Sequence, residues 1–475
     1  MNIHPRDSAL GQPVAVPPPE APRKPPMNAR TQRMLHGPIL STLLVMALPN
    51  VIVMVAQACT GLIETWFVAK LGTDALAGMA LVFPGVMLMQ MVSGGAMGGG
   101  ISSAIARALG AGRKDDADAL VLHAIVINVA LGLFFSVVML LFGRQIYGAL
   151  GGSGAELEAA LAYSNVVFAA NVLLWLTGAL ASVIRGTGNM LVPALVTSLG
   201  VFVLIPLSPA LIFGFGPIPA MGIAGGGIAF ALYYVAASAI LGWYVLSGRN
   251  ITRPRWGRLR WSMMSSILSV GAVASITSLQ TNVVIALATA LAASTLGAGA
   301  AAGYGTGARL EYLLIPIAFG LGAPLVALVG TNIGAGQKAR ALRIAFTGGA
   351  ITFLVAEIVG VAAALWPEVW ISQFSQDPTV IATGAAYLRI AGPAYGFFGL
   401  AMGLYFASQG AARLMWPLAA GFIRMGVALG GGWLAVTLTG SLHWLFAAIA
   451  LGLFVHGVIL FVAVWRGSLV GRHPG

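Results

Sequence analysis

The stretch LVPALVTSLGVFVLIPLSPALIF, residues 191–213, is 23 residues long and contains no charged side chain. A helix needs about 20 mainly apolar residues to cross the hydrocarbon core of a bilayer. Within lipid the backbone must satisfy its own hydrogen bonds, so such a stretch predicts a helix. Uncharged runs of this kind recur along the chain, at 75–106, 159–184, 186–248, 261–308 and 425–465.

The composition of the whole chain supports the same fold class. Of the 475 residues, 59% are hydrophobic and only 8% are charged, whereas soluble domains carry about 25% charged residues. We therefore expect an all-α integral membrane protein. The pattern predicts twelve transmembrane helices, at about 39–69, 74–106, 117–143, 157–184, 190–214, 221–246, 262–293, 299–333, 340–366, 379–408, 413–438 and 441–466.

Lysine and arginine residues gather on one side of this predicted bundle. If the N-terminus is cytoplasmic, 20 of the 25 Lys and Arg residues lie on the cytoplasmic side. Cytoplasmic loops of membrane proteins carry such an excess. The net charge of +12 therefore indicates a multi-pass protein of the plasma (inner) membrane with both termini cytoplasmic. We do not expect nucleic acid as a partner.

Short motifs recur between the two halves of the chain. GAGRK at 110–114 returns as GAGQK at 334–338, and two further pairs share the same offset of 224 residues. Parallel repeats of this kind are a known design of membrane transporters. The further pairs are AYSN at 162–165 with AYLR at 386–389, and RGTGNMLVP at 185–193 with QGAARLMWP at 409–417.

These repeats predict two pseudo-symmetric lobes of six helices each. A Pro-rich basic segment, PPPEAPRKPP at 17–26, has a composition typical of disorder. The expected organisation is a disordered tail at 1–38, a first lobe at 39–246, a cytoplasmic linker at 247–261, a second lobe at 262–466 and a C-terminal tail at 467–475.

Glu64 is an acidic residue inside the first predicted helix. Asn50, Gln57 and Glu64 are spaced by seven residues, close to two helical turns, so they share one face. A polar face on a membrane helix is expected to point into the bundle or a watery cavity. Desolvation favours the neutral form of a carboxyl group, which suits a proton or cation site. The alternative is that Glu64 pairs with an Arg or caps a neighbouring helix.

Three segments carry a resemblance to a known family. They are LGTDALAGMALVFP with GGGISSAIARALGAGRKDDA at 71–117, GARLEYLLIPIAFGLGAPLVALVGTNIGAGQKARA at 307–341, and AAYLRIAGPAYGFFGLAMGLYFASQG at 385–410. The chain resembles the multidrug and toxic compound extrusion (MATE) family over about 39–466. The resemblance implies cation-coupled export of amphipathic, often cationic, organic compounds by alternating access.

The resemblance also implies a role for Glu64, which matches an acidic residue tied to ion coupling in bacterial members. Its usual partners in the family are missing: Leu204 and Ser208 stand where the family often has Asn and Asp, and Gln280 and Phe398 stand where some members have an acid. One carboxylate with amides suits H⁺ better than Na⁺, although both stay open as coupling ions. We expect no other cofactor and no metal site.

Further polar and aromatic residues are candidates for a substrate cavity between the lobes. Glu311 and Arg309 are two positions apart and point away from each other on a helix, so Glu311 needs another partner or faces substrate. Methionine and aromatic side chains suit promiscuous binding of cations. The candidates are Gln280, Asn282, Glu311, Met87, Met91, Trp175, Tyr395 and Phe398.

Two other functions compete with a drug exporter. A lipid-linked saccharide flippase of the same superfamily would be expected to have a more basic central cavity, and only three arginines lie within the predicted helices. A membrane enzyme would need a cluster of catalytic side chains, but the six histidines are scattered. We therefore expect a monomeric antiporter, not an enzyme, with small organic molecules and membrane lipid as its partners.

Overall fold

The computed structural model describes residues 28–471, except for the side chains of residues 55–62, 296 and 312. Its regular structure is helical, apart from an isolated bridge between Phe215 and Ile218. The all-α fold expected from the sequence is confirmed. A short helix, α1 (Ala29–His36), precedes two lobes of longer helices.

The first lobe contains the helices that the first half of the repeat predicts. Two of the predicted helices are interrupted: a π-helical turn, η1, follows α3, and a bend of 46° separates α6 from α7. The elements are α2 (Ile39–Ala69), α3 (Thr73–Gln90), η1 (Met91–Met97), α4 (Gly98–Gly110), α5 (Lys114–Ala149), α6 (Gly154–Ala169), α7 (Asn171–Gly186), α8 (Leu191–Phe213) and α9 (Ile223–Leu246).

The second lobe repeats this order. Its first element is a long helix that breaks at Gly297, where φ is 81°, a conformation that favours glycine. The break separates the predicted seventh and eighth helices. The elements are α10 (Trp261–Gly334), α11 (Lys338–Leu365), α12 (Pro367–Ile371), α13 (Pro378–Ala391), η2 (Gly392–Ala394), α14 (Tyr395–Gly410), α15 (Met415–Met425), η3 (Gly426–Gly431), α16 (Gly432–Thr439) and α17 (Leu442–Trp465).

Each of the twelve predicted segments is occupied by helix. By length and apolarity, ten helices of the described chain can cross a membrane, or eleven if the bent pair α6 and α7 counts as one span. The stretch Ile39–Met54 of α2 is a shorter apolar helix by the same measure. The chain is therefore a multi-pass membrane protein.

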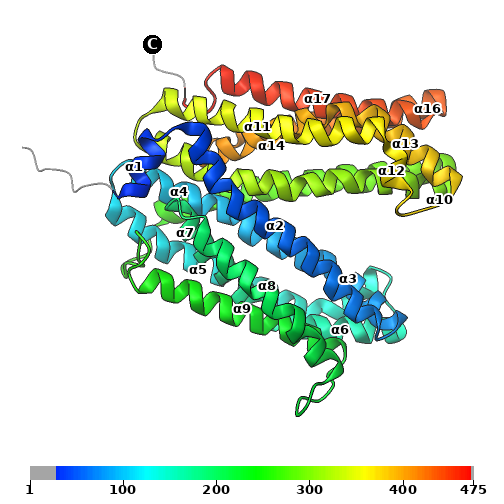
Figure 1. The fold of residues 1–475 in the computed structure, drawn as a ribbon, viewed down its shortest axis with the longest axis horizontal. Coiled ribbons are helices and arrows are strands. Elements are labelled where there is room, and N and C mark those ends of the chain that lie inside the picture. The colour runs from blue at the N-terminus through cyan, green and yellow to red at the C-terminus, as the bar shows by residue number, and fades with distance from the viewer. Residues whose placement is uncertain (1–27, 472–475) are drawn as a thin grey trace, which may run out of the picture.

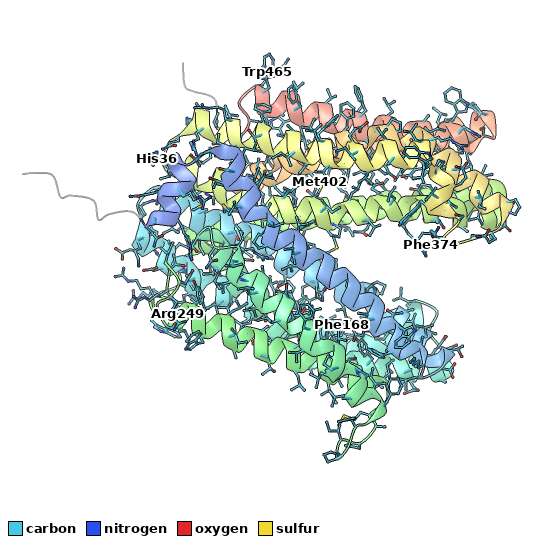
Figure 2. All side chains as sticks on the ribbon, in the orientation of Figure 1. His36, Phe168, Arg249, Phe374, Met402 and Trp465 are labelled. Atoms are coloured by element: carbon cyan, nitrogen blue, oxygen red, sulfur yellow. The ribbon has the colours of Figure 1, made fainter. Side chains whose placement is uncertain are left out.

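The two lobes lie close together at one end of the molecule and diverge toward the other (Figure 1). The close end contains α1, the loop between α9 and α10, and the start of α11, and we call it the linker end. The opposite end, where α3 and α12 lie, is the far end. Figure 2 shows His36 and Trp465 at the linker end and Phe374 at the far end.

Contacts between the lobes at the linker end are related by the repeat. A Cβ at Gly110 would overlap the carbonyl of Thr331, and a Cβ at Gly334 would overlap the carbonyl of Arg107. Gly334 is the repeat partner of Gly110, and Thr331 is the partner of Arg107, at the same offset of 224 residues. Such reciprocal contacts are the signature of a two-fold axis. The lobes are therefore related by a pseudo-two-fold axis that passes between α4 and α10.

Helix α1 departs from the expected disordered tail, which was placed at 1–38. Asn28 caps the helix by accepting a hydrogen bond from the Arg30 backbone N–H at 2.9 Å. Met34 and Leu35 are buried, and the Met34 carbonyl accepts a hydrogen bond from Asn332 Nδ2 at 3.1 Å. The tail prediction was wrong for 29–36 because these residues form a short amphipathic helix that buries its apolar face. Residues 1–27 lie outside the described part of the chain.

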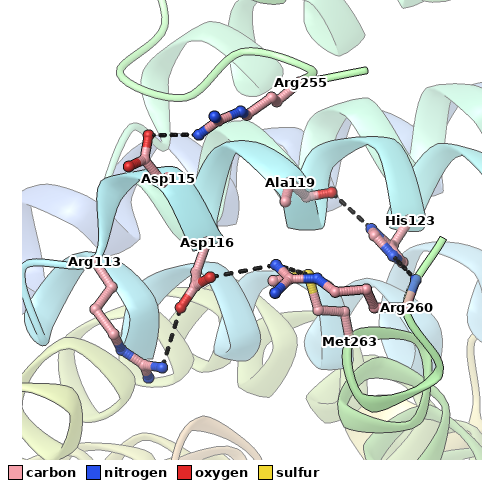
Figure 3. Close-up of polar contacts among 8 residues, drawn as sticks. All are labelled: Arg113, Asp115, Asp116, Ala119, His123, Arg255, Arg260 and Met263. Carbon is pink, nitrogen blue, oxygen red and sulfur yellow. Dashed lines mark hydrogen bonds and ion pairs between the residues drawn. The ribbon is translucent and has the colours of Figure 1, made fainter. Parts of the chain in front are cut away.

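The linker between the lobes is held by the start of α5 (Figure 3). Arg255 forms an ion pair with Asp115 at 2.8 Å, and Arg260 reaches Asp116 at 3.4 Å. The Arg260 backbone N–H donates to His123 Nε2 at 2.8 Å. The ring Nδ1 of His123 lies 2.8 Å from the Ala119 carbonyl, so Nδ1 carries the proton. These contacts tie the basic linker to acids of the first lobe.

Candidate functional site

Glu64 lies on α2, five residues before the end of that helix, and its side chain is half-buried inside the first lobe. Its Oε1 accepts a hydrogen bond from the Tyr163 hydroxyl of α6 at 3.2 Å. Helix α9 comes so near that a Cβ at Gly226 would lie 3.8 Å from the same oxygen. Three helices of one lobe therefore enclose the carboxyl group.

Close packing of α6 against α9 places Tyr163. Its side chain is 3% exposed, and a Cβ at Gly227 would lie 3.2 Å from its carbonyl. Next to it, a Cβ at Gly225 would overlap the carbonyl of Leu211 on α8. Small residues let membrane helices approach in this way. The glycine run at 225–227 therefore holds α6, α8 and α9 together around the site.

The charge environment of Glu64 is unusual for a half-buried acid. In the described part of the chain, no lysine or arginine forms an ion pair with it. The reading in which Glu64 pairs with an arginine therefore finds no support among these residues. A carboxyl group with a phenol donor and no basic partner can gain and lose a proton without breaking an ion pair.

A second polar contact in the first lobe involves residues that the sequence did not single out. Gln90 Nε2 donates to the Tyr234 hydroxyl at 3.2 Å. Tyr234 is 8% exposed and its ring packs edge-on against Phe230 at 4.7 Å. Gln90 ends α3 immediately before η1, and π-helical turns are frequent at functional sites. These side chains add hydrogen-bonding groups to the largely apolar interior of the first lobe.

The predicted stripe on α2 is not a single site in the structure. Asn50 and Glu64 are 14 residues apart, which is about 21 Å along a helix. Asn50 is 5% exposed and its amide nitrogen has no hydrogen-bond partner among the described residues. The adjacent Val51 packs against Gly320 of α10, so this part of α2 lies between the lobes. The side chain of Gln57 lies outside the described residues.

The predicted polar residues of the second lobe lie on α10. Gln280 is 7% exposed and packs against Gly421 of α15, with no described hydrogen-bond partner for its amide. The Asn282 side chain donates to the Ser278 carbonyl at 3.0 Å. Neither residue reaches the Glu64 site, which belongs to the other lobe.

Glu311 forms a buried ion pair with Arg424 of α15 at 2.7 Å. Their side chains are 2% and 5% exposed, and the guanidinium lies 5.4 Å from the ring centre of Phe398. Of the two interpretations of Glu311, the structure shows the ion pair. Arg389 pairs with Glu368 at the surface, and Glu357 accepts a hydrogen bond from the Gly396 backbone at 2.7 Å.

The predicted aromatic and methionine residues are spread over both lobes. Trp175 is fully buried in the first lobe and stacks on Phe135 with 5.6 Å between ring centres. Tyr395 and Phe398 are buried in the core of the second lobe. The structure does not bring these side chains together. The remaining two, Met87 and Met91, are half-buried in the first lobe.

Sequence reasoning missed Tyr163, although a signal was present. The residue belongs to AYSN at 162–165, and the same offset that relates the halves places Tyr387 at the equivalent position. The repeated tyrosine marks a position that packs inward in both lobes, since Tyr387 is also fully buried. The Tyr387 hydroxyl accepts a hydrogen bond from the Tyr395 hydroxyl at 3.4 Å. Of these two equivalent tyrosines, Tyr163 is the one with a described hydrogen bond to a carboxyl group.

Comparisons with known proteins agree with this architecture. The family model described as MatE matches residues 49–210 and 274–434. An FAD transporter of Shewanella oneidensis is 27% identical over 372 residues, covering 77% of this chain and 81% of the relative. A probable multidrug resistance protein NorM of Thermotoga maritima is 27% identical over 393 residues, covering 82% and 83% of the two chains.

Solved structures share the fold. A multidrug resistance MATE family transporter in an outward-facing conformation superposes with a TM-score of 0.85 at 21% identity, covering 94% of this chain and 99% of that one. A MATE protein in complex with MaD3S gives a TM-score of 0.85 at 22% identity, covering 93% and 99%. At these identities the likeness concerns the fold alone.

Proposed function

Because the chain belongs to the MatE family, whose members are membrane transporters and not enzymes, we propose that it is a secondary active antiporter. It exports amphipathic organic compounds and takes up protons in exchange, with Glu64 as the proton-binding group. The observation that carries this proposal is the Glu64 carboxyl group, which meets the Tyr163 hydroxyl at 3.2 Å and has no described ion-pair partner.

The chemistry of a partly desolvated carboxyl group supports coupling. In a poorly hydrated site the neutral form is favoured, whereas contact with water or with a cation favours the ionised form. Tyr163 can stabilise the ionised form because its hydroxyl donates to Oε1. A cationic substrate that approaches the first lobe therefore competes with the proton. Binding of one releases the other, which is the requirement for exchange.

Alternating access would expose this site to each side of the membrane in turn. The lobes touch at the linker end through α4 and α10 and diverge toward the far end (Figure 1). Glu64 lies near the end of α2, nine residues before α3 begins at Thr73. In this arrangement the site is nearer to the far end. Rocking of the lobes about their pseudo-two-fold axis would reverse the arrangement. We assign the far end to the outside, in keeping with the distribution of Lys and Arg.

The ligand set at Glu64 favours H⁺ over Na⁺ as the coupling ion. Hard cations are held by several oxygen ligands, and the described side-chain contact of the carboxylate is the single Tyr163 hydroxyl. A proton needs one carboxyl oxygen. Na⁺ remains the second candidate, and replacing Na⁺ with K⁺ in a transport assay distinguishes the two ions, because export coupled to H⁺ continues.

The names of the relatives guide the choice of substrates to test. Multidrug resistance proteins and an FAD transporter are both similar to this chain, so drugs and FAD are both compounds to test. We propose a cationic aromatic compound as substrate, because a carboxylate in an apolar lobe attracts cations. FAD, which carries phosphates, is the second candidate. If the protein is instead a flippase, its substrate would be a lipid-linked saccharide.

An accumulation assay tests the proposed function. Cells expressing the protein should accumulate less of the cationic dye ethidium than cells carrying an empty vector, and a proton uncoupler should abolish the difference. Export that survives the uncoupler but fails without Na⁺ would reassign the coupling ion. Equal accumulation with and without the protein, for ethidium and FAD alike, would contradict the proposal.

A further inference from the structure

An open-sided hollow of about 590 Å³ lies at the linker end, between the end of α1 and the start of α11. Its lining combines four basic side chains with the buried Leu35 and the 336–339 turn, and contains no acid. Figure 2 shows His36 on this side of the molecule. The basic residues are His36, Lys338, Arg340 and Arg343.

The repeat shows that this hollow departs from its counterpart in the first lobe. There the helix start is acidic. Asp115 and Asp116 pair with Arg255 and Arg260 of the linker (Figure 3), and Asp118 pairs with Lys114. At the same offset of 224 residues the second lobe has Ala339, Arg340 and Leu342. The three acids of one lobe are therefore replaced by two apolar residues and an additional base.

The basic side chains of the hollow are incompletely paired within the described chain. Lys338 and Arg343 form no ion pair with a described residue. Arg340 donates to the Gly37 carbonyl, while its Nε is buried with no described partner. These charges also surround the first turn of α11, where the positive end of the helix dipole favours an anion. An anionic partner would satisfy the side chains and the helix start together.

The outer face of α11 indicates which kind of anion fits. Two turns beyond Arg343, the same face of this helix becomes an exposed apolar stripe. The stripe extends over 16 residues, from Ala350 to Leu365, which is about 22 Å of helix and covers most of the roughly 30 Å of a hydrocarbon core. Its members are Ala350, Leu354, Ile358, Val361 and Leu365, of which Ile358 is 69% exposed.

We propose that this hollow binds the phosphate headgroup of an anionic phospholipid, whose acyl chains lie along the exposed stripe of α11. Lys338, Arg340 and Arg343 hold the phosphate, and the apolar stripe begins at Ala350, two turns beyond Arg343. Basic pockets at the cytoplasmic ends of membrane helices recognise anionic headgroups through this combination. A soluble phosphate compound would use the same charges but would gain nothing from the stripe.

Native mass spectrometry of the full chain in a neutral detergent tests the proposal. The probes are short-chain phosphatidylglycerol, phosphatidylcholine of the same chain length, and glycerol 3-phosphate. We expect phosphatidylglycerol to bind at least tenfold more tightly than phosphatidylcholine. The Lys338→Gln/Arg343→Gln variant should lose roughly 30-fold in affinity, because each removed charge contributes about fivefold. Neither side chain has a described ion pair, so the fold should not suffer.

The repeat provides a matched control. Arg113→Gln/Lys114→Gln removes two charges at the equivalent helix start of the first lobe and should leave phosphatidylglycerol affinity within twofold of the wild type. If the double variant of the hollow is poorly folded, Arg343→Gln alone should still lose about fivefold. An equal loss in the first-lobe control, an unchanged affinity in the hollow variants, or displacement of the lipid by glycerol 3-phosphate would each overturn the proposal.

Discussion

The hydroxyl group of Tyr163 donates a hydrogen bond to Oε1 of Glu64 at 3.2 Å, and this bond joins α6 to α2 inside the first lobe. The two residues are 99 positions apart in the chain. Movement of α2 relative to α6 would stretch or break this hydrogen bond. The Tyr163 hydroxyl therefore depends on the position of the Glu64 carboxyl group, and it also stabilises the negative charge of that group.

Replacing Tyr163 by Phe should slow proton-driven export without unfolding the protein. Hydrogen bonds to charged groups contribute about 1.5–3 kcal/mol, so we expect a loss of at least tenfold in the rate of dye export from proteoliposomes. Tyr147→Phe is the matched control, because the Tyr147 hydroxyl lies 2.7 Å from Ser164 Oγ in the same lobe and makes no described contact with Glu64. Equal rates in the two variants would contradict a role for Tyr163 at the carboxyl group.

The Glu311–Arg424 ion pair should stabilise the second lobe only while both partners are present. Glu311→Gln leaves a buried guanidinium without its partner, and removal of one member of a buried pair costs about 3–5 kcal/mol. The midpoint of thermal unfolding should fall clearly, and the Glu311→Gln/Arg424→Gln double variant should recover part of the loss.

The exposed pair Arg389–Glu368 offers the comparison for that experiment, since its side chains are 56% and 50% exposed. Glu368→Gln should change stability by about 0–1 kcal/mol. If Glu311→Gln is as stable as Glu368→Gln, the ion pair with Glu311 does not offset the free-energy cost of burying Arg424.

The reciprocal glycine contacts between the lobes predict two variants with matching effects. Gly110→Ala and Gly334→Ala each force a methyl group against a carbonyl of the opposite lobe, and overpacking costs about 1–3 kcal/mol. Both should weaken closure of the linker end and increase labelling of a cysteine placed at Ser103. Gly305→Ala is the control, because no atom lies within 4 Å of its added methyl group. Opposite effects of the two variants would contradict the pseudo-symmetry.

The membrane orientation can be tested with single cysteines. In a Cys59→Ala background, Ser153→Cys lies at the far end and Ser247→Cys follows α9 at the linker end. A membrane-impermeant reagent applied to intact cells should label only position 153, whereas permeabilised cells should show label at both. Label at position 247 in intact cells would reverse the orientation.

The helices could be predicted from the sequence because a long uncharged run has no alternative to a helix within lipid. The interruptions within these helices could not be predicted. The π-helical turn Met91–Met97 contains Gly94 and Gly95, but the glycines at 225–227 lie in the uninterrupted helix α9, so glycine alone does not mark an interruption. The pseudo-two-fold relation was visible in the GAG motifs, whose first glycines, Gly110 and Gly334, pack against the opposite lobe.

The candidate site could be predicted only in part, for a physical reason. A polar residue in an apolar helix indicates that it faces inward, and this drew attention to Glu64 and Glu311. Its partner depends on which helices pack together, and the spacing of one helix says nothing about this. Tyr163 and Arg424 are 99 and 113 residues away from their acids. For the same reason the aromatic candidates could not be assigned to one cavity.

The central claim, that Glu64 exchanges a proton for substrate, is tested most directly by proton release from purified protein in liposomes. Addition of substrate to the wild type should release protons, and substrate binding should rise with pH because the proton competes for the carboxylate. Glu64→Gln preserves the shape of the side chain but cannot titrate, so it should fold, release no protons and lose this pH dependence. Glu64→Asp should retain part of both. Equal proton release from wild type and Glu64→Gln would contradict the account and leave Glu64 as a packing residue.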